Sequence, residues 1–256
     1  MTRDLTERKL SEEKEKKYIA ALEFRNRELE QFAYIASHDM QEPLRKISMF
    51  SEIIENRAED KDAVSLYLHK ITKAASRMSN LINDVLNYSK LSDSSDISRD
   101  IDLNKILEEV KDDLEVVINK KNVTISSDKL PVIKGISYQF HQLFLNLLSN
   151  AIKFNTSEPF IRISTEKVAQ EELDMHPELD REVEHIRLLF EDNGIGIDPK
   201  YQGQIFKLFQ RLNDKNYEGT GIGLALCKRI VENHHGLIYL KSNIHQGSIF
   251  EVLLPA

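Results

Sequence analysis

The chain has 256 residues, of which 41% are hydrophobic and 30% charged, which indicates a soluble globular protein with room for two modest domains. Its net charge of −7 argues against nucleic acid as the main partner. Cys227 is the single cysteine, so an internal disulfide is excluded, and we expect a buried thiol in a cytoplasmic protein. The sequence has no apolar run of transmembrane length and no signal peptide, so we expect no membrane contact.

The N-terminal third of the sequence predicts a helical hairpin. Residues 1–17 are almost all charged or polar, which is typical of a solvated linker helix. From Tyr18 to Ile54, apolar residues recur at three- and four-residue steps, which predicts a long helix with a coiled-coil seam over residues 18–36. Residues 56–61 are polar and predict a hairpin turn. A second helix is expected from about Asp62, with the seam Val64, Leu68, Ile71, Ala75, Met78, Ile82 and Val85.

Two such hairpins would bury their seams together as a four-helix bundle, so we predict a homodimer. His69 lies beside the seam position Leu68, and we assign no chemistry to it. This all-α part extends over residues 18–91. Residues 92–100 are rich in serine and aspartate and predict a linker to a second domain at residues 101–256.

The stretch from Ser37 to Leu44 places a nucleophile, a carboxylate and a proline inside the first predicted helix. A neutral imidazole at His38 has one nitrogen with a free lone pair, and Asp39 is placed to accept a hydrogen bond from the other. Glu42 follows four residues later on the same helix face. Pro43 has no N–H, so we expect it to kink or loosen the helix. Taken alone, a helical histidine beside an acid is more often a solvated surface pair.

The second domain alternates helical and strand-like patterns. Asp102 is expected to cap a helix that ends near Ile118. The segment Glu166–His185 is acidic and predicts an extended hairpin loop, in which His176 and His185 have no neighbours that complete a metal site. The pattern predicts an α+β sandwich with a mostly antiparallel sheet. Its expected strands are Val123–Ser126, Ile161–Thr165, Ile186–Glu191, Leu237–Ser242 and Ser248–Leu254, and its expected helices Ser137–Phe154 and about Thr220–Asn233.

A polar stripe marks one of these predicted helices. Asn146, Asn150 and Lys153 fall at positions i, i+4 and i+7, which is one face of a helix whose other positions are apolar. Two amides and an ammonium group on one stripe are suited to a triphosphate and a hydrated Mg²⁺ ion, because Mg²⁺ takes few protein oxygens and keeps water and phosphate as its other ligands.

Two glycine-rich segments complete a possible nucleotide site. In the first, Glu191 to Ile197, a strand ends at Asp192, whose carboxylate is suited to accept a hydrogen bond from an exocyclic amine such as that of adenine, while Gly194 and Gly196 allow the backbone to approach a ring. The second, Gly219-Thr220-Gly221-Ile222-Gly223-Leu224, opens a helix whose N–H groups and dipole favour phosphate. By itself such a segment is often only a flexible turn, and the sequence has no P-loop motif.

Together these motifs resemble the sensor histidine kinases of two-component signalling. Ser37-His38-Asp39 is similar to the H box of that family, Asn146 to Asn150 to its N box, and Asp192-x-Gly194-x-Gly196 to its G1 box. Phe206-x-x-Phe209 resembles its F box, and Gly219-x-Gly221-x-Gly223 resembles its G2 box. The sequence of residues 32–45 is similar to that of the family branch found C-terminal to phytochrome and PAS sensors. Residues 3–9 resemble the segment that follows PAS domains.

The resemblance implies a dimerisation and histidine-phosphotransfer domain followed by a Bergerat-type ATP-binding domain. His38 would accept the γ-phosphoryl group of ATP and pass it to an aspartate of a response-regulator receiver, with Asp39 as the neighbouring base. Asn146, Asn150 and Lys153 would serve Mg²⁺ and phosphates, with Asn150 as the metal ligand, and residues 198–218 would form a mobile lid. Asp192 would bind adenine, and the other nucleotide contacts would be Gly194, Gly196, Ile197, Phe209, Gly219, Thr220, Gly221, Gly223 and Leu224.

Some features of the resemblance leave alternatives open. Phe206 and Phe209 would be either packing residues of the lid or contacts to the helical bundle, and we favour packing. Glu42 stands where many of these kinases carry threonine or asparagine, so we expect phosphatase activity toward the regulator to be weak or to use different chemistry. An upstream sensor domain, of PAS or phytochrome type, is expected to be missing. The rival interpretations are an ATPase machine of the same nucleotide-binding fold and a signalling adaptor that binds nucleotide without kinase activity.

Overall fold

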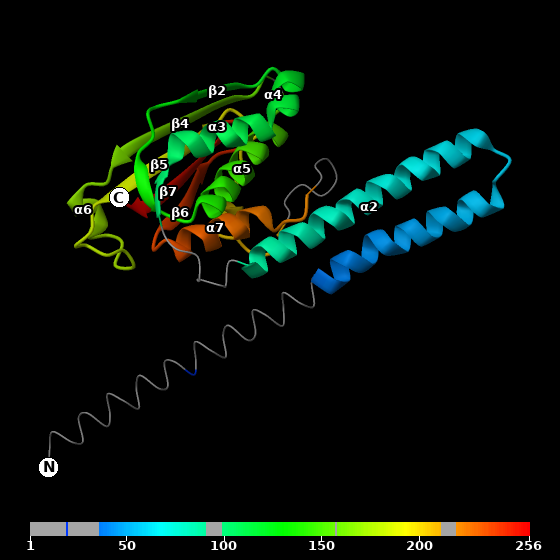
Figure 1. Ribbon diagram of the computed structural model, residues 1–256, viewed down its shortest axis with the longest axis horizontal. Coiled ribbons are helices and arrows are strands. Elements are labelled where there is room, and N and C mark those ends of the chain that lie inside the picture. The colour runs from blue at the N-terminus through cyan, green and yellow to red at the C-terminus, as the bar shows by residue number, and fades with distance from the viewer. Residues whose placement is uncertain (1–18, 20–35, 91–98, 157, 211–218) are drawn as a thin grey trace, which may run out of the picture. The chain divides into compact units, whose positions relative to one another are not determined.

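The computed structural model describes residue 19 and residues 36–90, 99–156, 158–210 and 219–256 (Figure 1). Two compact units are present, Met1–Ile82 and Asn83–Ala256. Several predicted segments fall outside the described residues: the linker at residues 1–17, nearly all of the coiled coil, residues 91–98 of the linker between domains, and residues 211–218 of the lid.

The first unit is a helical hairpin. Residues 36–56 are helical, residues 57–59 form a turn, and α2 (Lys61–Lys90) begins where the second helix was predicted, capped by Asp60, whose carboxylate accepts a hydrogen bond from the N–H of Ala63 at 3.1 Å. Across the hairpin the rings of Phe50 and Tyr67 lie 5.6 Å apart. We expected Pro43 to kink or loosen the helix. The helix has no break there, and the proline is buried.

The apolar residues of α2 fall on two faces. Ala74 and Leu81 are buried within the single chain. The predicted seam positions Leu68, Ala75 and Ile82, each seven residues apart, are exposed in the single chain. The predicted seam is thus divided in the single chain, since its other positions, Val64, Ile71, Met78 and Val85, are half-buried.

The second unit is an α+β sandwich, as predicted. Its main sheet has the strand order β2 (Thr124–Ser127), β4 (Phe160–Lys167), β5 (His185–Asp192), β7 (Ser248–Pro255) and β6 (Leu237–Ser242), and all pairings are antiparallel except that of β2 with β4. The helices α3 (Leu103–Asp113), α5 (Ser137–Lys153) and α7 (Gly223–Asn233) lie on one face of the sheet (Figure 1). Apolar side chains of these helices and the inner sheet face form one core, in which Phe140, Phe144 and Cys227 are fully buried.

Three expectations for this unit need correction. The predicted linker residues Arg99 and Asp100 belong to a strand, β1 (Arg99–Asp102), which pairs with β3 (Val132–Gly135); each strand has only four residues, too few to give a clear sequence signal. Asp102 does cap α3, since its carboxylate accepts the N–H of Asn104 at 3.0 Å, but the helix ends at Asp113 and a separate α4 (Glu115–Lys121) follows. The helix expected from Thr220 begins at Gly223.

The acidic insertion (residues 168–184) between β4 and β5 is an organised structure rather than an open loop. It contains the short helix α6 (Gln170–Leu173), and Leu173 and Leu179 pack with Leu253 of β7 in a small second core. Its His176 forms a hydrogen bond of 3.0 Å with Tyr239, and Nδ1 of His185, at the start of β5, lies 2.8 Å from the carbonyl oxygen of Val183.

An ion cluster joins the acidic insertion to the sheet. Arg187 of β5 forms ion pairs with Glu166 of β4, Glu172 of α6 and Glu251 of β7. The side chain of Glu251 is only 5% exposed, and its second oxygen lies 2.7 Å from Nζ of Lys241. Burial by itself lowers the pKa of Arg187, but the bonds to Glu172 and Glu166 and the charge of Glu251 outweigh it and raise the pKa above its ordinary value. Arg187 is therefore the cation on which three carboxylates depend.

Replacing Arg187 by methionine should strongly destabilise the protein, because it leaves the buried Glu251 with one cation and releases α6. Breaking a buried pair from one side typically costs about 3–5 kcal/mol, and because Lys241 remains we expect the lower end of that range. Urea unfolding followed by circular dichroism measures the change. Lys167→Met is the matched control, because it removes a cation from an exposed pair with Glu184 and should have little effect. Equal losses in both variants would contradict the assignment.

Candidate nucleotide site and phosphoacceptor histidine

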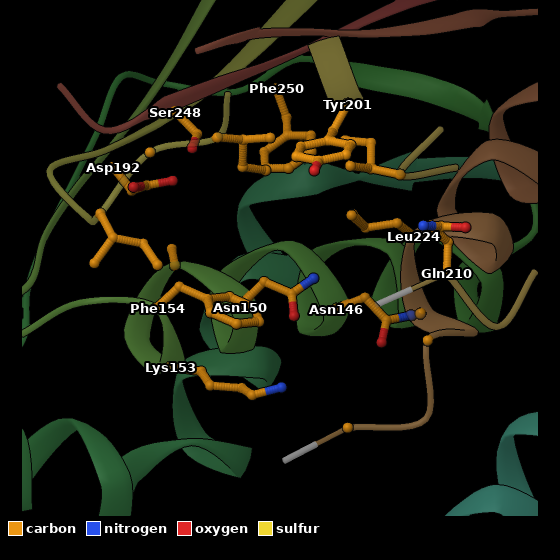
Figure 2. Close-up of a pocket in the computed structure, with 18 of the residues that line it drawn as sticks. Asn146, Asn150, Lys153, Phe154, Asp192, Tyr201, Gln210, Leu224, Ser248 and Phe250 are labelled. Atoms are coloured by element: carbon orange, nitrogen blue, oxygen red, sulfur yellow. The ribbon is translucent and has the colours of Figure 1, made fainter. Parts of the chain in front are cut away.

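A cavity of about 640 Å³ lies in the second unit, between α5, the end of β5, the start of α7 and the turn between β6 and β7 (Figure 2). This size is ordinary for a site that holds a small molecule. Figure 2 shows Asn146 and Asn150 on one side of the cavity, Tyr201 and Phe250 across from them, and Asp192 beside Ser248 at one end.

The polar stripe of α5 faces this cavity as predicted, because the opposite face of the helix buries Phe140, Phe144, Leu147 and Leu148 in the core. Nδ2 of Asn146 is buried and has no hydrogen-bond partner within the described part of the chain. Nζ of Lys153 lies 2.8 Å from the place that a side chain on Gly219 would take, so the ammonium group stands against the glycine loop. The amide group of Asn146 and the ammonium group of Lys153, beside the backbone of Gly219, fit a site for phosphate oxygens.

Asp192 ends β5 with its carboxylate held by backbone groups. Oδ1 accepts the N–H of Gly194 at 2.8 Å, and the N–H of Ser248 is a second donor. Burial raises the pKa of Asp192 above its ordinary value, although the two backbone bonds act in the opposite direction. A buried carboxylate with oxygen lone pairs facing the cavity is suited to accept hydrogen bonds from an amine such as that of adenine.

Two glycine turns interlock beneath this carboxylate. Gly196 has φ +69°, and a Cβ there would lie 1.9 Å from the carbonyl oxygen of Asn243. Gly247 has φ +78°, and a Cβ there would lie 1.9 Å from the carbonyl oxygen of Asp192. The buried Oγ of Ser242 accepts the N–H of Ile197 at 2.8 Å and donates to the carbonyl of Gly247 at 2.6 Å. The turn between β6 and β7 is thus part of the site, and only glycine permits this backbone contact.

The glycine loop (residues 219–222) precedes α7, whose first residue is Gly223. No side chain caps the N-terminus of this helix: the preceding Ile222 offers no acceptor, so the first N–H groups of α7 are available to a ligand. The helix dipole adds a preference for an anion at this end. Because Lys153 stands against the same loop, a phosphate group placed here would meet both backbone donors and a cation.

Most of the residues predicted for the nucleotide site line this cavity: Asn146, Asn150, Lys153, Asp192, Gly196, Ile197, Gly219, Thr220, Gly221, Gly223 and Leu224. Gly194 and Phe209 do not line it. Gly194 contributes its N–H to Asp192, and Phe209 adopts φ +61°. Phe206 packs on the core with its ring perpendicular to that of Phe250, at 6.5 Å, as the favoured packing role requires.

Sequence reasoning missed the apolar wall of the cavity, which includes Phe154, Tyr201, Ile205 and Phe250, and the polar side chains Gln210 and Ser248. Phe154 carried a usable signal, since it directly follows the polar stripe. Tyr201 sits in the short 3₁₀ helix η1 (Pro199–Tyr201), and Phe250 alternates with outward residues along β7, so neither stands out from ordinary core patterning. A flat apolar wall next to Asp192 suits an aromatic base.

In the first unit, His38 and Asp39 form the predicted pair. Nδ1 of His38 lies 3.2 Å from Oδ1 of Asp39, and the histidine side chain is 71% exposed. In the tautomer with its proton on Nδ1, His38 donates this hydrogen bond to the carboxylate and Nε2 presents its lone pair to solvent. Glu42, one turn further on, is paired with Lys46 and Arg77.

Within the described residues no group of three or more histidine, cysteine, aspartate or glutamate side chains is placed to hold a metal ion. Mg²⁺ is usually bound by one or two protein oxygens, with water and substrate phosphates as the remaining ligands. Amide oxygens on the α5 stripe beside a phosphate site fit that ligand set. Also within these residues, no helix is both long and apolar enough to cross a bilayer.

Comparison with known proteins defines the class to which this fold and site belong. Residues 135–256 match the model of the histidine kinase-, DNA gyrase B- and HSP90-like ATPases, and residues 28–94 match that of the His Kinase A (phospho-acceptor) domain. The chain carries both domains in the order that sensor histidine kinases have, and it belongs to that family.

Individual relatives agree with this assignment. Cyanobacterial phytochrome A of Nostoc sp. (strain PCC 7120) is 38% identical over 238 residues, which cover 91% of this chain and 29% of the relative. The chain thus spans about three tenths of the length of such relatives. Two solved structures share the fold: histidine kinase ThkA in complex with response regulator protein TrrA has a TM-score of 0.66 at 20% identity over 88% of this chain and 61% of that one. Full-length ShkA in complex with AMPPNP has a TM-score of 0.58 at 21% identity over 88% of this chain and 45% of that one.

Asp192→Asn should stabilise the nucleotide-free protein at pH 7 and abolish nucleotide binding. The raised pKa of Asp192 means that the folded state disfavours the charged carboxylate at neutral pH, and that this cost disappears as the pH falls through the raised pKa. The melting temperature of the variant should therefore exceed that of wild type at pH 7 and converge with it in acid. Asparagine keeps an acceptor for Gly194 but presents an amide in place of the charge.

Thermal melts with and without ATP measure both effects. Asp198→Asn is the control of opposite sign, because the side-chain bond to Lys200 lowers the pKa of Asp198, so its charge stabilises the fold at neutral pH. A nucleotide-dependent rise in melting temperature that survives in Asp192→Asn would contradict the role of this carboxylate.

Proposed function

We propose that this chain is the catalytic core of an ATP-dependent protein-histidine kinase that phosphorylates His38 and passes the phosphoryl group to an aspartate of a response regulator. The observation that carries the proposal is the presence, on one chain, of an exposed imidazole paired with Asp39 and of a cavity lined by Asp192, the polar stripe of α5 and the glycine loop before α7. In this proposal residues 18–91 are the phosphotransfer domain and residues 101–256 the ATP-binding domain, and the pairing of β1 (Arg99–Asp102) with β3 supports including Arg99 and Asp100 in the latter.

In this proposal the cavity holds ATP in one orientation. Adenine lies against the apolar wall, with its exocyclic amine bonded to Asp192, and the phosphates extend toward Lys153 and the glycine loop. Asn150, with Asn146 nearby, would hold Mg²⁺ through an amide oxygen. Held there, the ion would supply positive charge beside the phosphate oxygens. The match to an ATPase family supports ATP as the nucleotide.

The transfer step follows from the tautomer of His38. The lone pair of Nε2 attacks the γ-phosphorus, the bond to the bridging oxygen breaks, and ADP leaves with that electron pair. The ring becomes positively charged, and Asp39 stabilises that charge through the Nδ1 proton, which returns to the carboxylate or to solvent. In the second step a carboxylate oxygen of the receiver aspartate attacks the same phosphorus, and the ring recovers its lone pair.

Two copies of the chain are needed for the proposed assembly. Leu68, Ala75 and Ile82 form an exposed stripe at seven-residue spacing on α2, and Leu68 and Ile82 are 52% and 40% exposed. A second hairpin would cover this stripe as a four-helix bundle. The match to the phosphoacceptor domain family supports the same arrangement.

The partners follow from the same assignment. We propose a receiver domain as the phosphoryl acceptor, supported by the solved complex of ThkA with TrrA, and an upstream sensor, supported by the much greater length of the phytochrome relatives. The signal would reach His38 through residues 18–36, and we expect a cytoplasmic reaction. The adaptor interpretation and the ATPase without kinase activity do not account for a phosphoacceptor domain with an intact histidine and aspartate.

Incubation with γ-labelled ATP and Mg²⁺ tests the proposal. Wild type should gain label that is labile to acid and stable to alkali, as phosphohistidine is, and His38→Gln should gain none. His69→Gln is the matched control, because His69 is an exposed histidine of α2 that should label normally. Binding of ATP without label in wild type would favour the adaptor. Label that persists in His38→Gln would identify a different acceptor.

A further inference from the structure

Glu42 bridges the two helices of the first unit, one helical turn after His38. Its Oε1 accepts a hydrogen bond of 2.6 Å from Nζ of Lys46, and its Oε2 lies 3.7 Å from Nη2 of Arg77 on α2. The three side chains are 36–39% exposed, so the cluster is half-buried. The threonine or asparagine that many related kinases carry here forms no ion pair. Glu42 therefore ties an arginine of the second helix to the turn that carries the phosphoacceptor.

The register of the hairpin sets the distance between Arg77 and His38. Phe50 meets Tyr67 nearer the turn, and Glu42 meets Arg77 further from it, as two antiparallel helices of equal rise require. Arg77 is thus level with Glu42, which is four residues, or about 6 Å, along the axis from His38. This offset along the axis is within the length of an arginine side chain. Lys46 is eight residues from His38, about 12 Å along the same axis, and remains out of reach.

Phosphorylation creates an electrostatic problem at this position. A phosphoryl group brings a charge of about −1.5 to −2, and it would form on a ring whose other nitrogen is 3.2 Å from the carboxylate of Asp39. A guanidinium group offers planar, paired donors that match the oxygens of a phosphoryl group. If Arg77 turned toward His38, Lys46 would stay to neutralise Glu42.

We propose that Arg77 binds the phosphoryl group once it is on His38, and that Glu42 is the holding site for Arg77 before the transfer. This inference rests on the proposed kinase function. It assigns Glu42 and Arg77 a joint role in the stability of the phosphorylated state, and it gives the acid at position 42 a task other than activation of water.

The equilibrium of the phosphorylation reaction tests this role directly. Dimeric protein is incubated with Mg²⁺ and fixed ratios of ATP to ADP until the fraction of phosphohistidine is constant. Arg77→Gln should lower the equilibrium constant about tenfold, because the charge-assisted hydrogen bond lost from the phosphorylated state is stronger than the 3.7 Å pair with Glu42 lost from the unphosphorylated state. Arg77→Lys keeps the charge but lacks the paired donors of a guanidinium group, so its equilibrium constant should lie between those of wild type and Arg77→Gln. The affinity for ATP should not change in either variant.

Glu42→Gln should raise the equilibrium constant of phosphorylation, since Arg77 then has no Glu42 to leave. In the double variant with Arg77→Gln, the same change at Glu42 should raise this constant by a smaller factor. A purely structural role would not produce opposite signs or this dependence. Arg45→Gln is the control, because it removes one exposed arginine from the first helix and should leave the equilibrium unchanged.

Several outcomes would overturn the inference. An unchanged equilibrium in Arg77→Gln, with normal labelling of wild type, removes this role and leaves the kinase intact. If wild type gains no label, both the role of Arg77 and the proposed kinase function are rejected. If circular dichroism shows that Arg77→Gln is unfolded, Glu42→Gln and Arg77→Lys decide, and the absence of any increase in Glu42→Gln rejects the proposal.

Discussion

The nucleotide site depends on the backbone contact between two turns that are distant in sequence. The segment from Asp192 to Gly196 and the turn from Asn243 to Gly247 meet so closely that each uses a glycine where a side chain would overlap a carbonyl oxygen. This contact delivers the N–H of Ser248 to Asp192, and Ser242 fixes it with two hydrogen bonds. The position of the Asp192 carboxylate is therefore determined by strand pairing and not by the loop that follows it.

A second set of bonds joins the same loop to α5. The carbonyl of Phe154, just after the helix, accepts the N–H of Ile195 at 3.0 Å, and the side chain of Asn193 bonds to Asn155, to the N–H of Phe160 and to the carbonyl of Glu158. The stripe that would hold phosphate and the carboxylate that would hold adenine are thus fixed to one another. The proposed adenine and phosphate positions therefore belong to one hydrogen-bonded framework.

Sequence patterns predicted the local features well. The strands of the main sheet, the cap at Asp102 and the stripe on α5 depend on neighbouring residues or on simple periodicity, and the structure confirms them. Features that depend on distant contacts were missed: β1 and β3 are stable only as a pair, and Tyr201, Ser242 and Phe250 acquire their roles through packing between strands and loops. The seam of α2 was ambiguous because a helix in a bundle has two apolar faces, and periodicity alone does not assign a partner to each.

Four carboxylates show how environment, more than residue type, sets the role of an acid in this protein. Asp192 is buried against backbone donors and has a raised pKa, which suits it to recognise a neutral amine. Glu251 is less accessible still, but it is matched by Arg187 and Lys241, so it serves the fold alone. Asp39 and Glu42 lie on a half-exposed helix, where solvent lowers the cost of changing partners. An acid that must release its cation during a reaction cycle has to stand at such a surface. This is why the nucleotide site is built into a packed core, whereas the phosphoacceptor and the cluster around Glu42 lie on an open hairpin.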